Sequence, residues 1–133
     1  MRLRPPWRRR ADPRGLPDGL WADDFARVDR ACRRFAQVAG GRADLEVVRA
    51  TLGEVRAAAW ETCLAAAARG SRSGVEEVPR EDDLAALHRA LSRAAGRCAQ
   101  AAEAVVLGGH DGGAAAARRA ADQALVLLRP TSE

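Results

Sequence analysis

The stretch Leu107-Gly108-Gly109-His110-Asp111-Gly112-Gly113, near the end of the chain, decides the expected fold. Apolar residues recur every three or four positions over a long window before this stretch and over a shorter one after it, which is the spacing of an amphipathic helix. Glycine commonly ends helices, and Asp111 is a suitable N-cap residue for the helix that follows. The stretch therefore predicts the turn between a long helix and a short final helix.

The same spacing extends back through most of the chain and predicts four helices, over about residues 19–39, 43–69, 80–107 and 112–129. Helices joined mostly by short connections pack most simply as an antiparallel up-down bundle. We therefore expect an all-α fold, with one four-helix domain over residues 19–133. The apolar stripes are, helix by helix, Trp21, Phe25, Val28, Cys32, Phe35 and Ala39; Leu45, Val48, Leu52, Val55, Ala59, Thr62 and Ala66; Leu84, Leu87, Leu91, Ala94, Cys98, Ala101 and Val105; and Ala117, Ala121, Ala124 and Leu128.

The net charge of the chain, +4, resides in its first residues. Residues 1–18 hold six arginines and two aspartates, whereas the remaining arginines and acids balance. Short Pro-rich and charged ends are typically disordered, so we expect a flexible basic arm over residues 1–18. Nucleic acid is not an expected partner beyond weak phosphate contacts by Arg8, Arg9 and Arg10.

Composition indicates the cellular setting. The chain contains no Lys, Ile, Asn or Tyr, residues that share AT-rich codons, and their joint absence indicates a GC-rich bacterial genome. No long apolar run is present, so no membrane span is predicted. Cys32, Cys63 and Cys98 are odd in number and lie inside helical patterns, which favours reduced, buried thiols. We expect a cytoplasmic protein.

The sequence offers few groups for catalysis. It has two histidines, and neither follows a glutamate at the Glu-x-x-His spacing of a bundle dimetal site. No metal, phosphate-loop or catalytic residues are predicted, so we expect no enzyme activity from this chain by itself. His88 lies at the border of an apolar stripe, where histidine phosphotransfer domains carry their phosphorylated residue. The Lys and Gly that usually follow it there are missing, so a half-packed boundary histidine is the favoured interpretation.

Four short motifs follow one another along the chain: Arg33-Arg34-Phe35-Ala36, Leu107-Gly108-Gly109, Arg118-Arg119 with Asp122, and Thr131-Ser132-Glu133. Their order, over about residues 20–133, resembles the C-terminal helical bundle of the acyl-CoA dehydrogenase family. In that family a glutamine contacts the flavin and a glutamate serves as the base; these positions fall on Val105 and Arg129, and Asp111 replaces a glycine. The resemblance thus implies a stand-alone bundle without the catalytic base and without a cofactor of its own.

Three functional hypotheses follow. The first is an interaction or accessory subunit that associates with a protein partner or with itself, through an exposed strip of Trp60, Cys63 and Ala67; the alternative for Trp60 is that it fills the bundle's own core. The second, implied by the resemblance, is a subunit that completes an FAD or acyl-CoA site with a partner chain. Arginine suits phosphate groups, and Arg33, Arg34, Arg118 and Arg119 are the candidates. The third is phosphotransfer through His88.

Overall fold

The structure, a computed structural model, describes residues 19–71, 81–109 and 112–129. Within these ranges the chain forms four α-helices and no strand. The helices are α1 (Leu20–Ala39), α2 (Glu46–Ser71), α3 (Glu81–Gly108) and α4 (Ala114–Leu128), and a short 3-10 helix, η3 (Ala43–Leu45), leads into α2. The all-α four-helix fold expected from the sequence is confirmed. The predicted arm, residues 1–18, lies outside the described residues.

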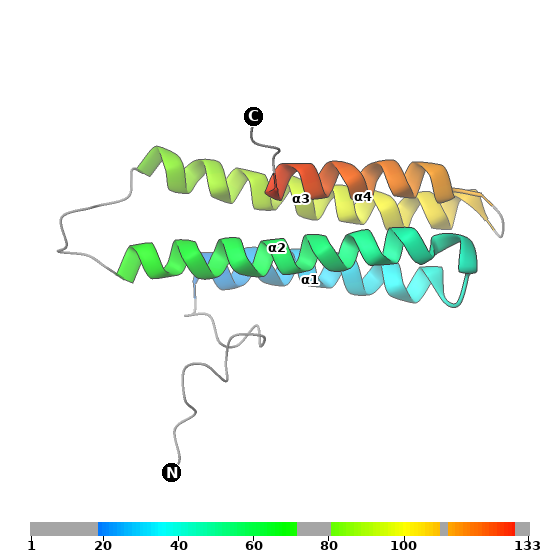
Figure 1. Ribbon diagram of the computed structural model, residues 1–133, viewed down its shortest axis with the longest axis horizontal. Helices are drawn as coiled ribbons and strands as arrows, with labels where there is room; N and C mark the ends of the chain where they lie inside the picture. Colours follow the sequence, from blue (N-terminus) through cyan, green and yellow to red (C-terminus); the bar gives the residue numbers. More distant parts are fainter. Residues whose placement is uncertain (1–18, 72–80, 110–111, 130–133) are drawn as a thin grey trace, which may run out of the picture.

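Successive helices alternate in direction and form two hairpins, α1 with α2 and α3 with α4 (Figure 1). The hairpins lie side by side, so that α1 packs against α3 and α2 packs against α4. Partner residues advance together along α1 and α3, from Asp24 with His88 to Arg34 with Glu103. Helices α1 and α3 therefore run parallel, and the consecutive helices α2 and α3 occupy opposite corners of the bundle.

Thr62, Leu84 and Leu87 of the predicted apolar stripes are only partly buried, and most of the other stripe residues form the core. Its largest fully buried side chains include Phe25, Phe35, Leu45 and Leu91, and the inner face of α4 consists of Ala117, Ala120, Ala121 and Ala124. Alanine buries little area but lets helix axes approach closely, so the bundle depends on a few large anchors. Leu128, predicted on the inner face of α4, is only partly buried.

The double-glycine stretch brings α3 and α4 into close contact. A Cβ atom added to Gly108 would clash with the backbone of Gly113, and one added to Gly113 would overlap the carbonyl oxygen of Ala104. Gly113 also has a φ of 87° and occupies the N-cap position of α4, without a side-chain cap. The prediction that Asp111 caps this helix is therefore wrong, because a glycine with a left-handed backbone makes the turn; Asp111 itself lies outside the described residues.

Arg42 fastens this turn to the other connection at the same end of the bundle. Its guanidinium donates to the carbonyl oxygens of Gly109 and Gly112, at 3.1 and 3.3 Å, and to the carboxylate of Asp44. The nearby Arg49 donates to the carbonyl oxygen of Gly40, at the end of α1, and to that of Arg42, which also accepts from the backbone N–H of Leu45. Within the described residues, no helix combines the length and the hydropathy that crossing a bilayer requires.

Candidate functional site

Helix α1 carries two buried aspartates, Asp24 and Asp29, which are 1% and 8% exposed. A buried carboxylate is costly unless it is paired and hydrogen-bonded. The two residues lie on opposite borders of the apolar stripe of α1, so that Asp24 meets α3 and Asp29 meets α2. Each aspartate therefore marks a polar site between α1 and a neighbouring helix.

Asp24 is paired with His88. Its Oδ2 atom lies 2.5 Å from Nδ1 of the imidazole, and the side chain of Asp24 is fully buried while that of His88 is 34% exposed. The other oxygen, Oδ1, is buried and has no hydrogen-bond partner in the described part of the chain; Nη1 of Arg27 lies 3.6 Å from it, within ion-pair distance. His88 is thus the half-packed boundary residue favoured from the sequence, with one ring nitrogen held by a carboxylate.

Asp29 is paired with two arginines. Nε of Arg56, on α2, lies 2.5 Å from Oδ1, and Nε of Arg33 lies 3.0 Å from Oδ2. The guanidinium of Arg56 also lies over the ring of Phe25, 5.2 Å from its centroid, which adds a cation–π attraction. These contacts neutralise Asp29 and join α1 to α2.

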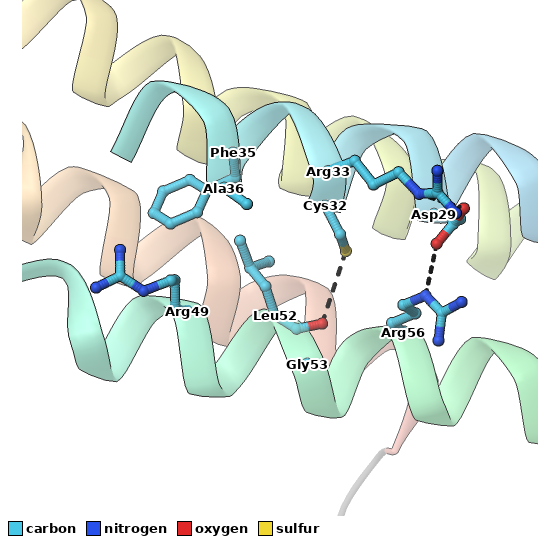
Figure 2. A pocket seen from close by; sticks show the side chains of 9 residues that line it. All are labelled: Asp29, Cys32, Arg33, Phe35, Ala36, Arg49, Leu52, Gly53 and Arg56. Atoms are coloured by element: carbon cyan, nitrogen blue, oxygen red, sulfur yellow. Dashed lines mark hydrogen bonds and ion pairs between the residues drawn. The ribbon is translucent and has the colours of Figure 1, made fainter. Parts of the chain in front are cut away.

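A cleft of about 410 Å³ opens beside this pair, between α1 and α2. Figure 2 shows the sulfur of Cys32 inside it, directed toward the carbonyl oxygen of Leu52, with the Asp29–Arg56 pair at one end. We name it the α1–α2 cleft; its lining is Asp29, Cys32, Arg33, Phe35, Ala36, Arg49, Leu52, Gly53 and Arg56. A partly accessible thiol thus lies among three arginines.

The thiols of the bundle differ in acidity. A hydrogen bond with Cys98 lowers the pKa of Cys32, and the charge of Arg56 acts in the same direction, against burial and the charge of Asp29. The bond that Cys32 donates to Leu52 is long, at 3.6 Å, and favours the protonated thiol only weakly. The same Cys32 bond, with burial, raises the pKa of Cys98, and burial raises that of Cys63 to about 12. Cys32 is therefore the thiol closest to ionisation.

A second depression, of about 690 Å³, lies on the other side of α1, against α3. Helix α1 lines it with four arginines, and α3 contributes small side chains. None of its lining residues in the described part of the chain is acidic. We name it the α1–α3 groove; it is formed by Arg27, Arg30, Ala31, Arg33, Arg34 and Gln37 from α1 and by Ser92, Ala95, Gly96 and Ala99 from α3.

The predicted interaction strip is largely internal. Cys63 is 0% exposed, Trp60 and Ala67 are partly buried against the core, and the ring of Trp60 stands edge-on to Phe25 with centroids 5.3 Å apart. Edge-to-face packing of this kind stabilises a core. The geometry favours the alternative in which Trp60 packs into the bundle's own core, because its ring meets the buried Phe25. Cys63 beside it offers no surface to a partner.

The four candidate arginines do not converge. Arg33 and Arg34 line the α1–α3 groove, whereas Arg118 and Arg119 lie exposed on α4, the helix diagonal to α1. Among the described residues, the ion pair of Arg118 is a long exposed contact with Asp122, 4.0 Å. Arg33 and Arg34 therefore lie together in the α1–α3 groove, whereas Arg118 and Arg119 lie on another helix, away from that groove.

Sequence reasoning missed Asp24, Asp29, Arg27 and Arg30. A signal for the aspartates was present, since each adjoins a core residue of α1, Asp24 before Phe25 and Asp29 after Val28. Acidic residues at the border of a stripe normally face solvent, however, so their burial depended on partners in other helices. Among the described residues, no three His, Cys, Asp or Glu side chains gather as metal ligands would.

Comparison with known proteins provides no relative. No protein-family model, curated protein or solved structure matches this chain. The resemblance to the acyl-CoA dehydrogenase bundle therefore depends on the four short sequence motifs alone. Val105, which the resemblance aligns with the flavin-contacting glutamine, is a core residue that is 4% exposed. Arg129, which the resemblance aligns with the base, is paired with Glu61 at 3.4 Å.

Proposed function

We propose that this protein is a non-catalytic interaction module that binds an acidic helical segment of a partner protein in the α1–α3 groove. The observation that carries the proposal is the line of four arginines on one face of α1, beside a floor of alanine and glycine. A groove with cationic rims and small floor residues is complementary to a helix that presents carboxylates on its flanks.

The arginines of the groove are available to a partner. Arg30 makes no ion pair within the described part of the chain. Arg27, Arg33 and Arg34 pair with Asp24, Asp29 and Glu103, but roughly half or more of each arginine side chain remains exposed. Exposed ion pairs contribute only about 0–1 kcal/mol, so exchange of the Arg34–Glu103 pair, which is exposed on both sides, costs little. Asp24 and Asp29 are buried, so Arg27 and Arg33 keep these contacts and offer only their remaining donors to a partner.

The floor of the groove supports a close approach. A Cβ atom added to Gly96 would meet no atom within 4 Å, so the space above this residue is open. Ala31, Ala95 and Ala99 beside it are also small, and small residues permit close packing of helix backbones. The chain's own residues 1–18 are a poor occupant, because their six arginines would be repelled.

Binding of FAD or acyl-CoA phosphates in a site completed by another chain is less well supported. That hypothesis requires the arginines of α1 and α4 to act together, and α1 and α4 occupy opposite corners of the bundle. The two hypotheses differ in the ligand they require, so one titration separates them.

The test is fluorescence anisotropy with a labelled helical peptide of Glu, Ala and Leu, and with a matched peptide in which Lys replaces Glu. We expect the full-length protein to bind the acidic peptide only, and added salt to weaken this binding. Arg30→Glu should lower the affinity about tenfold, and Gly96→Gln should lower it by occupying the floor without disturbing the bundle. Arg118→Glu, the same charge reversal on α4, is the matched control.

Two results would overturn the proposal. One is equal binding by the wild type, Arg30→Glu and Gly96→Gln, which would place the peptide elsewhere. The other is displacement of the peptide by free FAD or coenzyme A at low concentration, which would favour the phosphate-ligand hypothesis. Light scattering on the same samples tests self-association, since a dimer that is unaffected by Arg30→Glu would show that copies of the chain associate through another face.

A further inference from the structure

The imidazole of His88 is held in one orientation by a buried carboxylate. Because an ionised carboxylate only accepts hydrogen bonds, the contact of 2.5 Å between Nδ1 and Oδ2 of Asp24 places the ring proton on Nδ1. In the neutral imidazole, the other nitrogen, Nε2, then carries the lone pair. Within the described residues Nε2 has no hydrogen-bond partner, and it is not among the buried unpaired atoms. Nε2 is therefore a solvent-accessible nucleophile of fixed tautomer.

Donors for an anionic group lie one helical turn further along. Arg27 donates from Nη1 to Oγ of Ser92 at 3.4 Å, and Ser92 follows His88 by four residues on α3, so both side chains lie on the same face. Arg27 and Ser92 both line the α1–α3 groove. An accessible imidazole thus adjoins a guanidinium and a hydroxyl, two groups that bind phosphoryl oxygens.

We propose that His88 accepts a phosphoryl group at Nε2. The donor is a phosphoramidate or an acyl phosphate, including such a group on another protein. The Nε2 lone pair forms the bond to phosphorus while the bond from phosphorus to the donor's nitrogen or oxygen breaks, and the electron pair of that bond leaves with the donor. With phosphoramidate, ammonia departs and no proton is removed from the ring.

Asp24 is the positioning residue of this step. As the bond to phosphorus forms, positive charge develops on the ring, which keeps its proton on Nδ1. The carboxylate of Asp24, fully buried at 2.5 Å from that nitrogen, offsets this charge, and a carboxylate acts in the same way on the imidazole of a catalytic triad. The inference is independent of the acidic partner proposed above.

The experiment uses the full chain and phosphoramidate as the donor, with ³¹P NMR and peptide mass spectrometry as readouts. The chain supplies its own control, because His110 is the only other histidine. We expect one phosphoryl group on His88, attached at Nε2, labile in acid and stable in alkali. His88→Gln should abolish this signal, and His110→Gln should retain it.

The role of Asp24 is tested with Asp24→Asn. We expect labelling of His88 to slow about ten- to hundredfold, comparable to the effect of removing a carboxylate that orients a metal-bound histidine, and ¹⁵N NMR to show that the ring no longer holds a single tautomer. Because a change at a buried site can unfold the protein, Ser92→Ala and Arg27→Gln provide exposed variants that should slow labelling while circular dichroism stays unchanged. Equal labelling of His88 and His110, attachment at Nδ1, or no phosphoryl group on His88 would each overturn the proposal.

Discussion

Nη1 of Arg42 donates a hydrogen bond of 3.1 Å to the carbonyl oxygen of Gly109 and so joins the two connections at one end of the bundle. Arg42 lies between α1 and η3, whereas Gly109 follows α3. The two residues belong to different hairpins, and 67 positions separate them in the chain. This contact therefore contributes to the alignment of one hairpin with the other.

Replacement of Arg42 by alanine should destabilise the fold. It removes hydrogen bonds to two carbonyl oxygens, and bonds from a charged donor contribute about 1.5–3 kcal/mol each when buried. Because the side chain of Arg42 is 21% exposed, we expect a loss of about 1–3 kcal/mol in the free energy of unfolding. Urea denaturation followed by circular dichroism measures it. Arg42→Lys should recover part of the loss, since lysine keeps the charge but lacks the fork; an effect no larger than that of Arg118→Ala would contradict this role.

Two glycines should respond in opposite directions to alanine. Gly113→Ala forces a side chain into a left-handed conformation and against the carbonyl oxygen of Ala104, so a loss of about 2 kcal/mol or more is expected. Gly96→Ala adds a methyl group in open space within α3 and should stabilise the protein by about 0.5–1 kcal/mol. Thermal melts of both variants provide the comparison, and a shift in the same direction for both would show that the turn is more adaptable than its geometry indicates.

Cys32 should be the first thiol to react with iodoacetamide. Its pKa is lowered by the hydrogen bond with Cys98 and by Arg56, and the thiolate is the reactive form. Cys63 and Cys98 are buried and have raised pKa values. Mass spectrometry after brief labelling should find adducts on Cys32 alone, with a rate that rises at a lower pH than for an ordinary thiol. Arg56→Gln should shift this rate profile to higher pH, whereas simultaneous labelling of all three cysteines under native conditions would refute the expected order.

Alkaline pH should reveal the burial of Cys63. Its pKa is raised from 9.0 to about 12 in the folded protein, so above pH 9 the unfolded chain loses its proton before the folded chain does. Stability therefore falls as the pH rises from 9 toward 12. Denaturation curves at increasing pH should show that the difference in stability between the wild type and Cys63→Ala becomes smaller above pH 9. A difference that stays constant would mean that Cys63 titrates alike in both states.

The helices could be predicted from the sequence because the spacing of apolar residues indicates both a helix and the face of it that is buried. Phe25, Val28 and Phe35 of the first stripe are all buried. It was not sufficient to predict which helices become neighbours, since short connections are compatible with more than one arrangement of the corners. Asp24 and His88 lie 64 positions apart, and nothing local in either segment indicates that they meet.

The error at Asp111 has a similar cause. An aspartate before a helix is a common cap, but at this turn the backbone of Gly113 adopts a φ of 87° and the crossing of α3 and α4 excludes side chains. The α1–α3 groove was likewise beyond prediction, because Arg30 and Gly96 become neighbours only through the parallel packing of their helices. The sequence identified Arg33 and Arg34 as candidates without indicating what else lies beside them.

The parallel packing of α1 and α3 also has a kinetic consequence. Each hairpin consists of neighbouring stretches of chain, whereas the contacts between hairpins, such as those of Arg27 with Ser92 and Arg34 with Glu103, span 65 and 69 positions. Contacts between distant positions form late, because a long loop must close first. We therefore expect the hairpins to form early and to dock in the slow step of folding. Asp24 and His88 can pair only after the two hairpins have docked. A chain with two formed but separate hairpins therefore has neither the α1–α3 groove nor the oriented histidine.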